Sequence, residues 1–140
     1  MELVWFVLLT AGLFAALAVL RNERRRRARR AATVELTVDA LGARRVLADG
    51  REERVDWDEV REVDVVRARS GPHAASGGVL MLAGDAERGC LVPLDRLDTT
   101  GVVEHLVRLP GFDTAALVAA LDRPAPSRTT VWSRAGARPG

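Results

Sequence analysis

The chain opens with an uncharged apolar stretch that meets a cluster of arginines. Residues 3–20 read LVWFVLLTAGLFAALAVL and hold no charged side chain, whereas residues 21–30 read RNERRRRARR. In an α-helix at about 1.5 Å per residue, the apolar stretch spans roughly 27 Å, close to the hydrocarbon thickness of a bilayer. We therefore expect a transmembrane helix over residues 1–20 and an arginine-rich juxtamembrane segment over residues 21–32.

The position of the basic residues separates an anchor from a cleaved secretory signal peptide. A signal peptide carries its positive charge before the apolar stretch, but the first six residues, MELVWF, contain no basic side chain. The small residues at 15–18, AALA, resemble a cleavage site, yet Val19, Leu20 and the arginines follow them directly. The positive-inside tendency then predicts an N-terminus outside the cell and a cytoplasmic domain at the inner membrane.

Charge is distributed unevenly along the chain. Residues 1–32 carry seven arginines and two glutamates, a net charge of +5, whereas residues 33–140 carry fourteen arginines and seventeen acidic residues, a net charge of −3. A nucleic-acid-binding domain normally has a basic folded surface, so we expect no nucleic acid partner. Every basic residue is an arginine, which we interpret as the codon bias of a GC-rich bacterial genome. With Cys90 as the single cysteine, the sequence forms no internal disulfide, which fits a reducing cytoplasm.

The arginines of the juxtamembrane segment are the first candidate site. Basic residues near an anionic leaflet each contribute about 1 kcal/mol to membrane affinity, so the cluster is expected to hold anionic lipid headgroups. A role as a topology determinant is the alternative, and the two are compatible. The arginine cluster consists of Arg21, Arg24, Arg25, Arg26, Arg27, Arg29 and Arg30.

Residues 33–134 begin with short apolar segments separated by turn residues, a pattern typical of an antiparallel sheet. Asp49-Gly50 is a strong hairpin signal, because glycine adopts a positive φ without a steric clash. A tight turn is expected at 58–61 and a loop at 70–78. The predicted strands cover residues 33–39, 43–48, 51–57, 62–69, 79–84 and 90–94.

The pattern becomes helical near the C-terminus. Thr99 or Thr100 is expected to cap one helix and Asp113 a second. The fold class predicted is α+β, with a transmembrane helix followed by antiparallel hairpins that C-terminal helices cover. The predicted elements are helices over 101–109 and 114–122, a last strand over 129–134 and a flexible tail over 135–140.

Several segments of residues 33–134 carry a resemblance to known families. The VDWDEVREVDV segment at 55–65, the Gly-Pro loop, the helix into LPGFD and the terminal VWSR resemble small actinobacterial single-pass membrane-anchored proteins of uncharacterised function. The order of strands before helices, with a strand that ends at Trp57 before an acidic turn, is also similar to bacterial pleckstrin-homology-like (PH-like) domains. Those domains usually end in one capping helix, whereas two helical segments are predicted here. The resemblance implies a PH-like interaction domain and carries over no functional residues.

No metal, cofactor or catalytic group is expected from the remaining polar residues. The acidic stretch at 52–64 lacks the alternate oxygen ligands and the glycine of an EF-hand loop, and interspersed arginines are typical of a solvated face. His73, His105 and Cys90 lack the paired spacing of metal ligands. The 70–78 loop contains serine and histidine, but without the spacing of a nucleophile elbow.

Three side chains remain as candidates for binding a protein partner: Trp57, His73 and Trp132. Large aromatic residues dominate interface energetics, although burial in the core is the alternative for both tryptophans. His73 lies in a predicted loop, and loops often carry binding function. The sequence thus predicts a membrane-anchored binding or scaffolding module without enzymatic activity. The alternative is a small membrane-associated enzyme with no recognisable catalytic motif.

Overall fold

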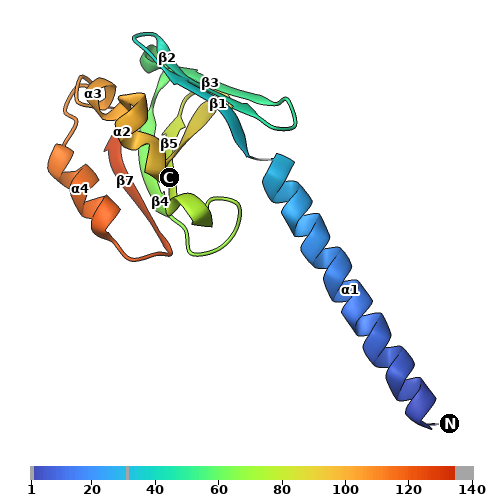
Figure 1. Ribbon diagram of the computed structural model, residues 1–140. Coiled ribbons are helices and arrows are strands. Elements are labelled where there is room, and N and C mark those ends of the chain that lie inside the picture. The colour runs from blue at the N-terminus through green and yellow to red at the C-terminus, as the bar shows by residue number, and fades with distance from the viewer. Residues whose placement is uncertain (1, 31, 135–140) are drawn as a thin grey trace.

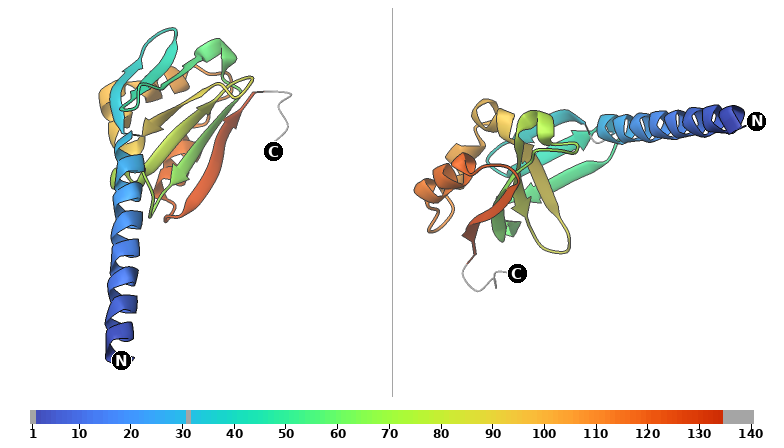
Figure 2. Two further views of the ribbon diagram at one scale, coloured as in Figure 1. Left: turned by 90° about the vertical axis from the view of Figure 1, so that its right-hand side faces the viewer. Right: turned by 90° about the horizontal axis from the view of Figure 1, so that it is seen from below.

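A long helix precedes a fold of two sheets and short helices in the computed structural model, which describes residues 2–30 and 32–134 (Figure 1). Helix α1 covers Glu2–Arg30 and extends away from the sheets in each view (Figure 2). By length and composition it is able to cross a membrane, and none of the candidate span is buried as the core helix of a soluble fold would be. The arginine cluster continues this same helix, so about 15 Å of helix lies beyond Leu20.

Seven strands form two antiparallel sheets within the described residues. The first sheet has the order β1-β2-β3 and the second the order β6-β5-β4-β7. The last strand of the chain, β7, therefore pairs with β4. The strands are β1 Thr33–Val38, β2 Gly42–Leu47, β3 Glu52–Asp56, β4 Glu62–Arg67, β5 Gly78–Ala83, β6 Gly89–Pro93 and β7 Ser127–Ser133.

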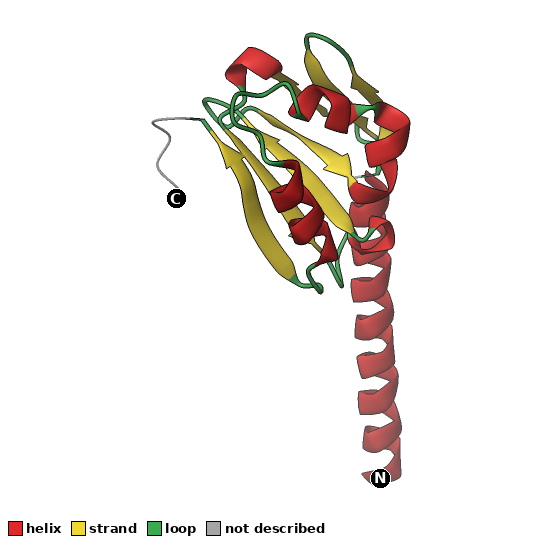
Figure 3. Cartoon of the chain, turned by 90° about the vertical axis from the view of Figure 1, so that its left-hand side faces the viewer, coloured by secondary structure: helices red, strands yellow, loops and turns green. Residues whose placement is uncertain are grey.

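Three short α-helices follow β6, and Figure 3 shows helices in front of one face of the four-stranded sheet. They are α2 Leu97–Thr100, α3 Val102–Leu106 and α4 Thr114–Asp122. Their buried residues, such as Leu106 and Leu117, join Val65 and Leu80 of the sheet in one hydrophobic core. Burial of each such side chain stabilises the fold by about 1.5–3 kcal/mol, so this core fixes the helices on the sheet.

An ion pair within the first sheet is linked to the second sheet by a hydrogen bond. The Oε1 atom of Glu53 on β3 lies 3.1 Å from Nη1 of Arg45 on β2 and accepts a hydrogen bond of 3.1 Å from the backbone N–H of Leu91 on β6. The Arg45 side chain is 3% exposed, and its Nε donates to Oγ1 of Thr33 at 2.7 Å. One carboxylate therefore holds the edge strand β6 against the first sheet.

The predicted α+β class is confirmed: an apolar N-terminal helix, antiparallel strands and C-terminal helices are all present. Gly50 adopts a φ of +85° between β2 and β3, as its hairpin signal required. Asp113 caps α4, since its Oδ1 accepts hydrogen bonds from the N–H groups of Ala115 at 2.9 Å and Ala116 at 3.3 Å. The tail predicted for 135–140 lies outside the described residues.

The helix predicted over 101–109 forms in part. Helix α3 covers Val102–Leu106, and a hydrogen-bonded turn over 107–109 follows it. Thr100, one of the two expected caps, accepts a weak 3.4 Å hydrogen bond at Oγ1 from the N–H of Val102. The short helix α2 was not predicted; it lies before Gly101, whose φ of +69° separates it from α3.

Gly42 begins β2 and pairs with Asp56 of β3. A Cβ atom at this position would collide with the carbonyl oxygen of Val55 and lie 2.7 Å from Cα of Asp56. Both neighbours are backbone atoms, so the strands would have to move apart.

We expect Gly42→Ala to destabilise the full chain by about 1–3 kcal/mol, the usual cost of overpacking. Urea unfolding in detergent micelles, followed by tryptophan fluorescence, measures this change. Thr37→Ala on the exposed side of β1 is the control and should stay within about 0.5 kcal/mol. Equal urea midpoints for Gly42→Ala and the parent chain would refute the close approach.

Candidate partner-binding cleft

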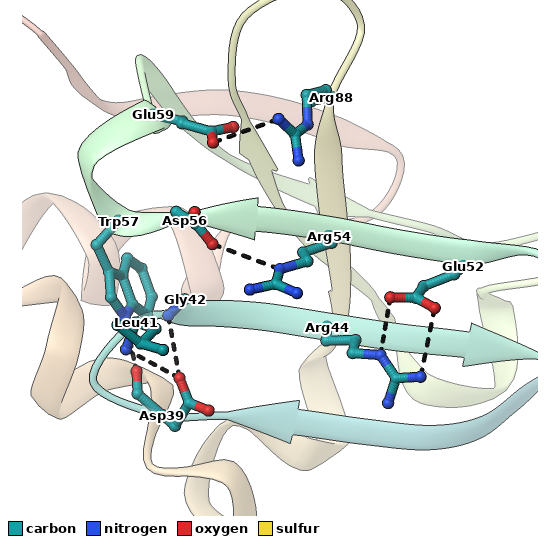
Figure 4. A network of polar contacts seen from close by, with 10 residues as sticks. All are labelled: Asp39, Leu41, Gly42, Arg44, Glu52, Arg54, Asp56, Trp57, Glu59 and Arg88. Carbon is teal, nitrogen blue, oxygen red and sulfur yellow. Dashed lines mark hydrogen bonds and ion pairs between the residues drawn. The ribbon is translucent and has the colours of Figure 1, made fainter.

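The turn between β1 and β2 is organised by Asp39. Its Oδ1 accepts hydrogen bonds from the N–H groups of Leu41 at 2.9 Å and Gly42 at 3.1 Å (Figure 4). These two hydrogen bonds lower the pKa of the Asp39 carboxyl, because they favour its charged form. An ionised Asp39 therefore holds the turn at the end of the first sheet that lies away from α1 (Figure 1).

Trp57 is fixed against this turn. Its indole Nε1 donates to the carbonyl oxygen of Asp39 at 2.8 Å, and its backbone N–H donates to the carbonyl oxygen of Leu41 at 2.9 Å. The ring stacks on the imidazole of His105, with ring centroids 5.4 Å apart and an interplanar angle of 16°. Since His105 belongs to α3, the stack ties the first sheet to the helices.

A cleft of about 590 Å³ opens beside this stack. Its size lies in the range typical of ligand sites, roughly 300–1,000 Å³. The Arg134 guanidinium reaches in from the end of β7, and its Nη2 donates to the carbonyl oxygen of Trp57 at 3.5 Å. The lining residues are Ala40, Trp57, Asp58, His105, Arg108, Leu109, Pro110 and Arg134.

The acidic stretch at 52–64 contributes ion pairs on the neighbouring face of the first sheet (Figure 4). Arg44 Nε lies 2.8 Å from Oε1 of Glu52, and two further pairs join Arg54 to Asp56 and Arg88 to Glu59. Across residues 2–30 and 32–134, no group of three or more histidine, cysteine, aspartate or glutamate side chains is placed to hold a metal ion.

His73 and Ser76 lie together in the loop before β5, but they do not form a nucleophile and base. The Ser76 hydroxyl lies 3.0 Å from the carbonyl oxygens of both His73 and Gly78, its backbone acceptors. His73 is half-buried, and burial lowers its pKa, with a further contribution from the positive charge of Arg45. Cys90 is 2% exposed, and burial raises the pKa of its thiol to about 12, so it stays protonated and unreactive at neutral pH.

Trp132 is a core residue. Its side chain is 6% exposed, and its Nε1 donates to the carbonyl oxygen of Pro110 at 2.8 Å. Burial therefore favours the core role over a partner anchor for this tryptophan. Trp132 instead supports the cleft from behind, because Pro110 is one of the lining residues.

The arginine cluster occupies the last turns of α1. Its described side chains are exposed, with an ion pair of 3.5 Å between Arg27 Nε and Oε1 of Glu23. The side chain of Arg30 lies outside the described residues. Lipid binding by the arginine cluster stays a prediction.

The cleft combines residues that the sequence analysis did not bring together. Trp57 was a candidate, but His105 was considered only as a metal ligand and set aside, and the two arginines of the lining were not singled out. Positions 57, 105 and 134 are distant in sequence, so no local motif marks them. Only the tertiary pairing of β7 with β4 brings Arg134 to Trp57.

Comparison with known proteins gives no match: neither a family model, nor a curated protein, nor a solved structure matches this chain. The resemblance to actinobacterial membrane-anchored proteins and to PH-like domains stays a prediction.

The lowered pKa of His73 predicts a pH dependence of stability. Since the folded pKa lies below the ordinary value of 6.5, the unfolded chain binds this proton more readily. The stability present above about pH 6.5 is therefore lost as the pH falls toward the folded pKa. Urea midpoints between about pH 7 and pH 5 should decline less steeply for His73→Asn than for the parent chain. An NMR titration that places the His73 pKa above 6.5 would contradict the sign.

Proposed function

We propose that this chain is a membrane-anchored binding or scaffolding module at the inner face of a bacterial cell membrane. Helix α1 spans the bilayer with its N-terminus outside, and the fold of residues 33–134 lies in the cytoplasm. The observation that carries the proposal is the preformed cleft beside Trp57, at the end of the first sheet away from the anchor helix.

Distance from the bilayer supports a protein partner for the cleft. The helix continues about 15 Å past Leu20, and the six residues of β1 add roughly 20 Å before the Asp39 turn. The headgroup region of one leaflet is only about 5–8 Å thick. At this distance the cleft lies in water beyond the lipid headgroups, where a protein partner can reach it and lipid cannot.

The arginine cluster supports the proposed orientation and a second contact with the membrane. Its charge follows the apolar stretch, as the positive-inside tendency requires of a cytoplasmic flank. Exposed guanidinium groups on the last turns of α1 are free to reach anionic headgroups by extending along the helix. The acidic balance of residues 33–140 leaves the fold itself weakly repelled from the same surface.

A binding role accounts better than catalysis for the reactive side chains of the fold. The Ser76 hydroxyl is bonded to backbone carbonyls, and the Cys90 thiol is buried and protonated. Trp57 and His105, in contrast, present a fixed ring surface at the cleft. A rigid aromatic surface is typical of interface anchors.

Photo-crosslinking in the native host tests the proposed binding role. A benzophenone amino acid at Ala40, on the exposed rim of the cleft, should yield adducts with a protein partner. The same probe at Val118, which is 54% exposed on α4, is the matched control and should not yield that adduct. Lipid adducts alone at Ala40, or identical adducts at both positions, would exclude the cleft as the binding site.

A further inference from the structure

We infer that the cleft beside Trp57 recognises a short acidic segment of a protein, with one carboxylate held by Arg108 and Arg134 and an apolar neighbour packed on Trp57. This inference rests on the proposed binding function and names the chemistry of the partner. The two halves of the ligand follow from the arginines and the aromatic ring that line the cleft.

Arg108 is the first of these groups. It follows α3 and is exposed on the cleft wall, and its guanidinium has no hydrogen bond or ion pair with any residue of 2–30 and 32–134. Arg44 and Arg54 on the neighbouring face are paired with carboxylates. An unpaired guanidinium offers a planar fork of N–H donors that matches a carboxylate in two parallel hydrogen bonds.

Arg134 supplies a second cationic group on a backbone that is tied to the sheet. Its backbone N–H donates to the carbonyl oxygen of Arg61 at 2.8 Å, and Nη2 of its exposed guanidinium makes one long hydrogen bond of 3.5 Å to the Trp57 carbonyl. A guanidinium has five N–H donors, so this single contact leaves others for a ligand.

The apolar half of the ligand follows from how Trp57 is held. Its indole N–H is already bonded to the Asp39 carbonyl, so the indole contributes ring surface and no donor. Leu109 and Pro110 complete an apolar wall. The Pro110 carbonyl oxygen already accepts a hydrogen bond from Trp132, so it adds no free polar group to this wall. An aliphatic or aromatic side chain therefore fits beside the carboxylate.

Charge limits the ligand to few acidic groups. Asp58 also lines the cleft and would repel a second carboxylate nearby. The net charge of −3 over residues 33–140 likewise disfavours a long polyanion such as nucleic acid. A peptide with one acidic residue next to an apolar residue matches both constraints.

Selection of random octapeptides displayed on phage, against the full chain in lipid nanodiscs, tests this inference. The selected peptides should be enriched in aspartate or glutamate beside an apolar residue. Fluorescence polarisation with a selected peptide should then show at least about tenfold weaker binding to Arg108→Glu, because charge-assisted hydrogen bonds are lost. Arg96→Glu is the matched control, because Arg96 is exposed and lies outside the cleft lining, and its substitution changes the charge by the same amount.

Recovery of no peptide, peptides without acidic residues, or equal binding to Arg108→Glu and Arg96→Glu would overturn the inference. Crosslinking separates this failure from failure of the proposed function. A protein adduct at Ala40 that persists in Arg108→Glu leaves the binding function standing and removes acidic recognition. Loss of the adduct in Arg108→Glu but not in Arg96→Glu supports the acidic recognition.

Discussion

The fold depends on the Glu53 carboxylate, which lies between the two sheets. A buried guanidinium is stable only when its charge is paired, and the Glu53 carboxylate supplies the opposite charge for Arg45. The same carboxylate accepts a hydrogen bond from the backbone N–H of Leu91 on the edge strand β6. One group therefore pairs with the buried cation and also bonds the edge strand of the second sheet. Arg45 also bonds Thr33, the first residue of β1. These contacts therefore extend to the start of β1, close to the end of α1.

The cleft lies beside the Asp39 turn, at the end of β1 opposite to Thr33. At the other end of the first sheet, β2 and β3 lie close enough that only glycine fits at position 42. The Asp39 turn follows directly, and its carbonyl holds the Trp57 indole in place against His105. Helix α1 and the Asp39 turn thus lie at opposite ends of β1. In our proposal, this separation lets the membrane position the domain without competing for its binding surface.

Local signals in the sequence predicted the elements but not the site. The uncharged apolar stretch, Asp49-Gly50 and the Asp113 cap act within a few residues, so α1, the β2–β3 hairpin and α4 could all be anticipated. The short helix α2 before Gly101 was not predicted, because four residues are too few to show apolar periodicity. The cleft requires residues 57, 105 and 134 to meet through tertiary pairing. Paired arginines and the unpaired Arg108 look alike in a sequence, because only their neighbours differ.

The central claim is that α1 holds the domain at the cytoplasmic face of the membrane. The most direct measurement joins a topology reporter to the C-terminus of the full chain and extracts the membranes at high pH. The account predicts a full-length product that resists extraction and a reporter active only in the cytoplasm. A soluble product that lacks residues 1–20, or a reporter active outside the cell, would contradict it.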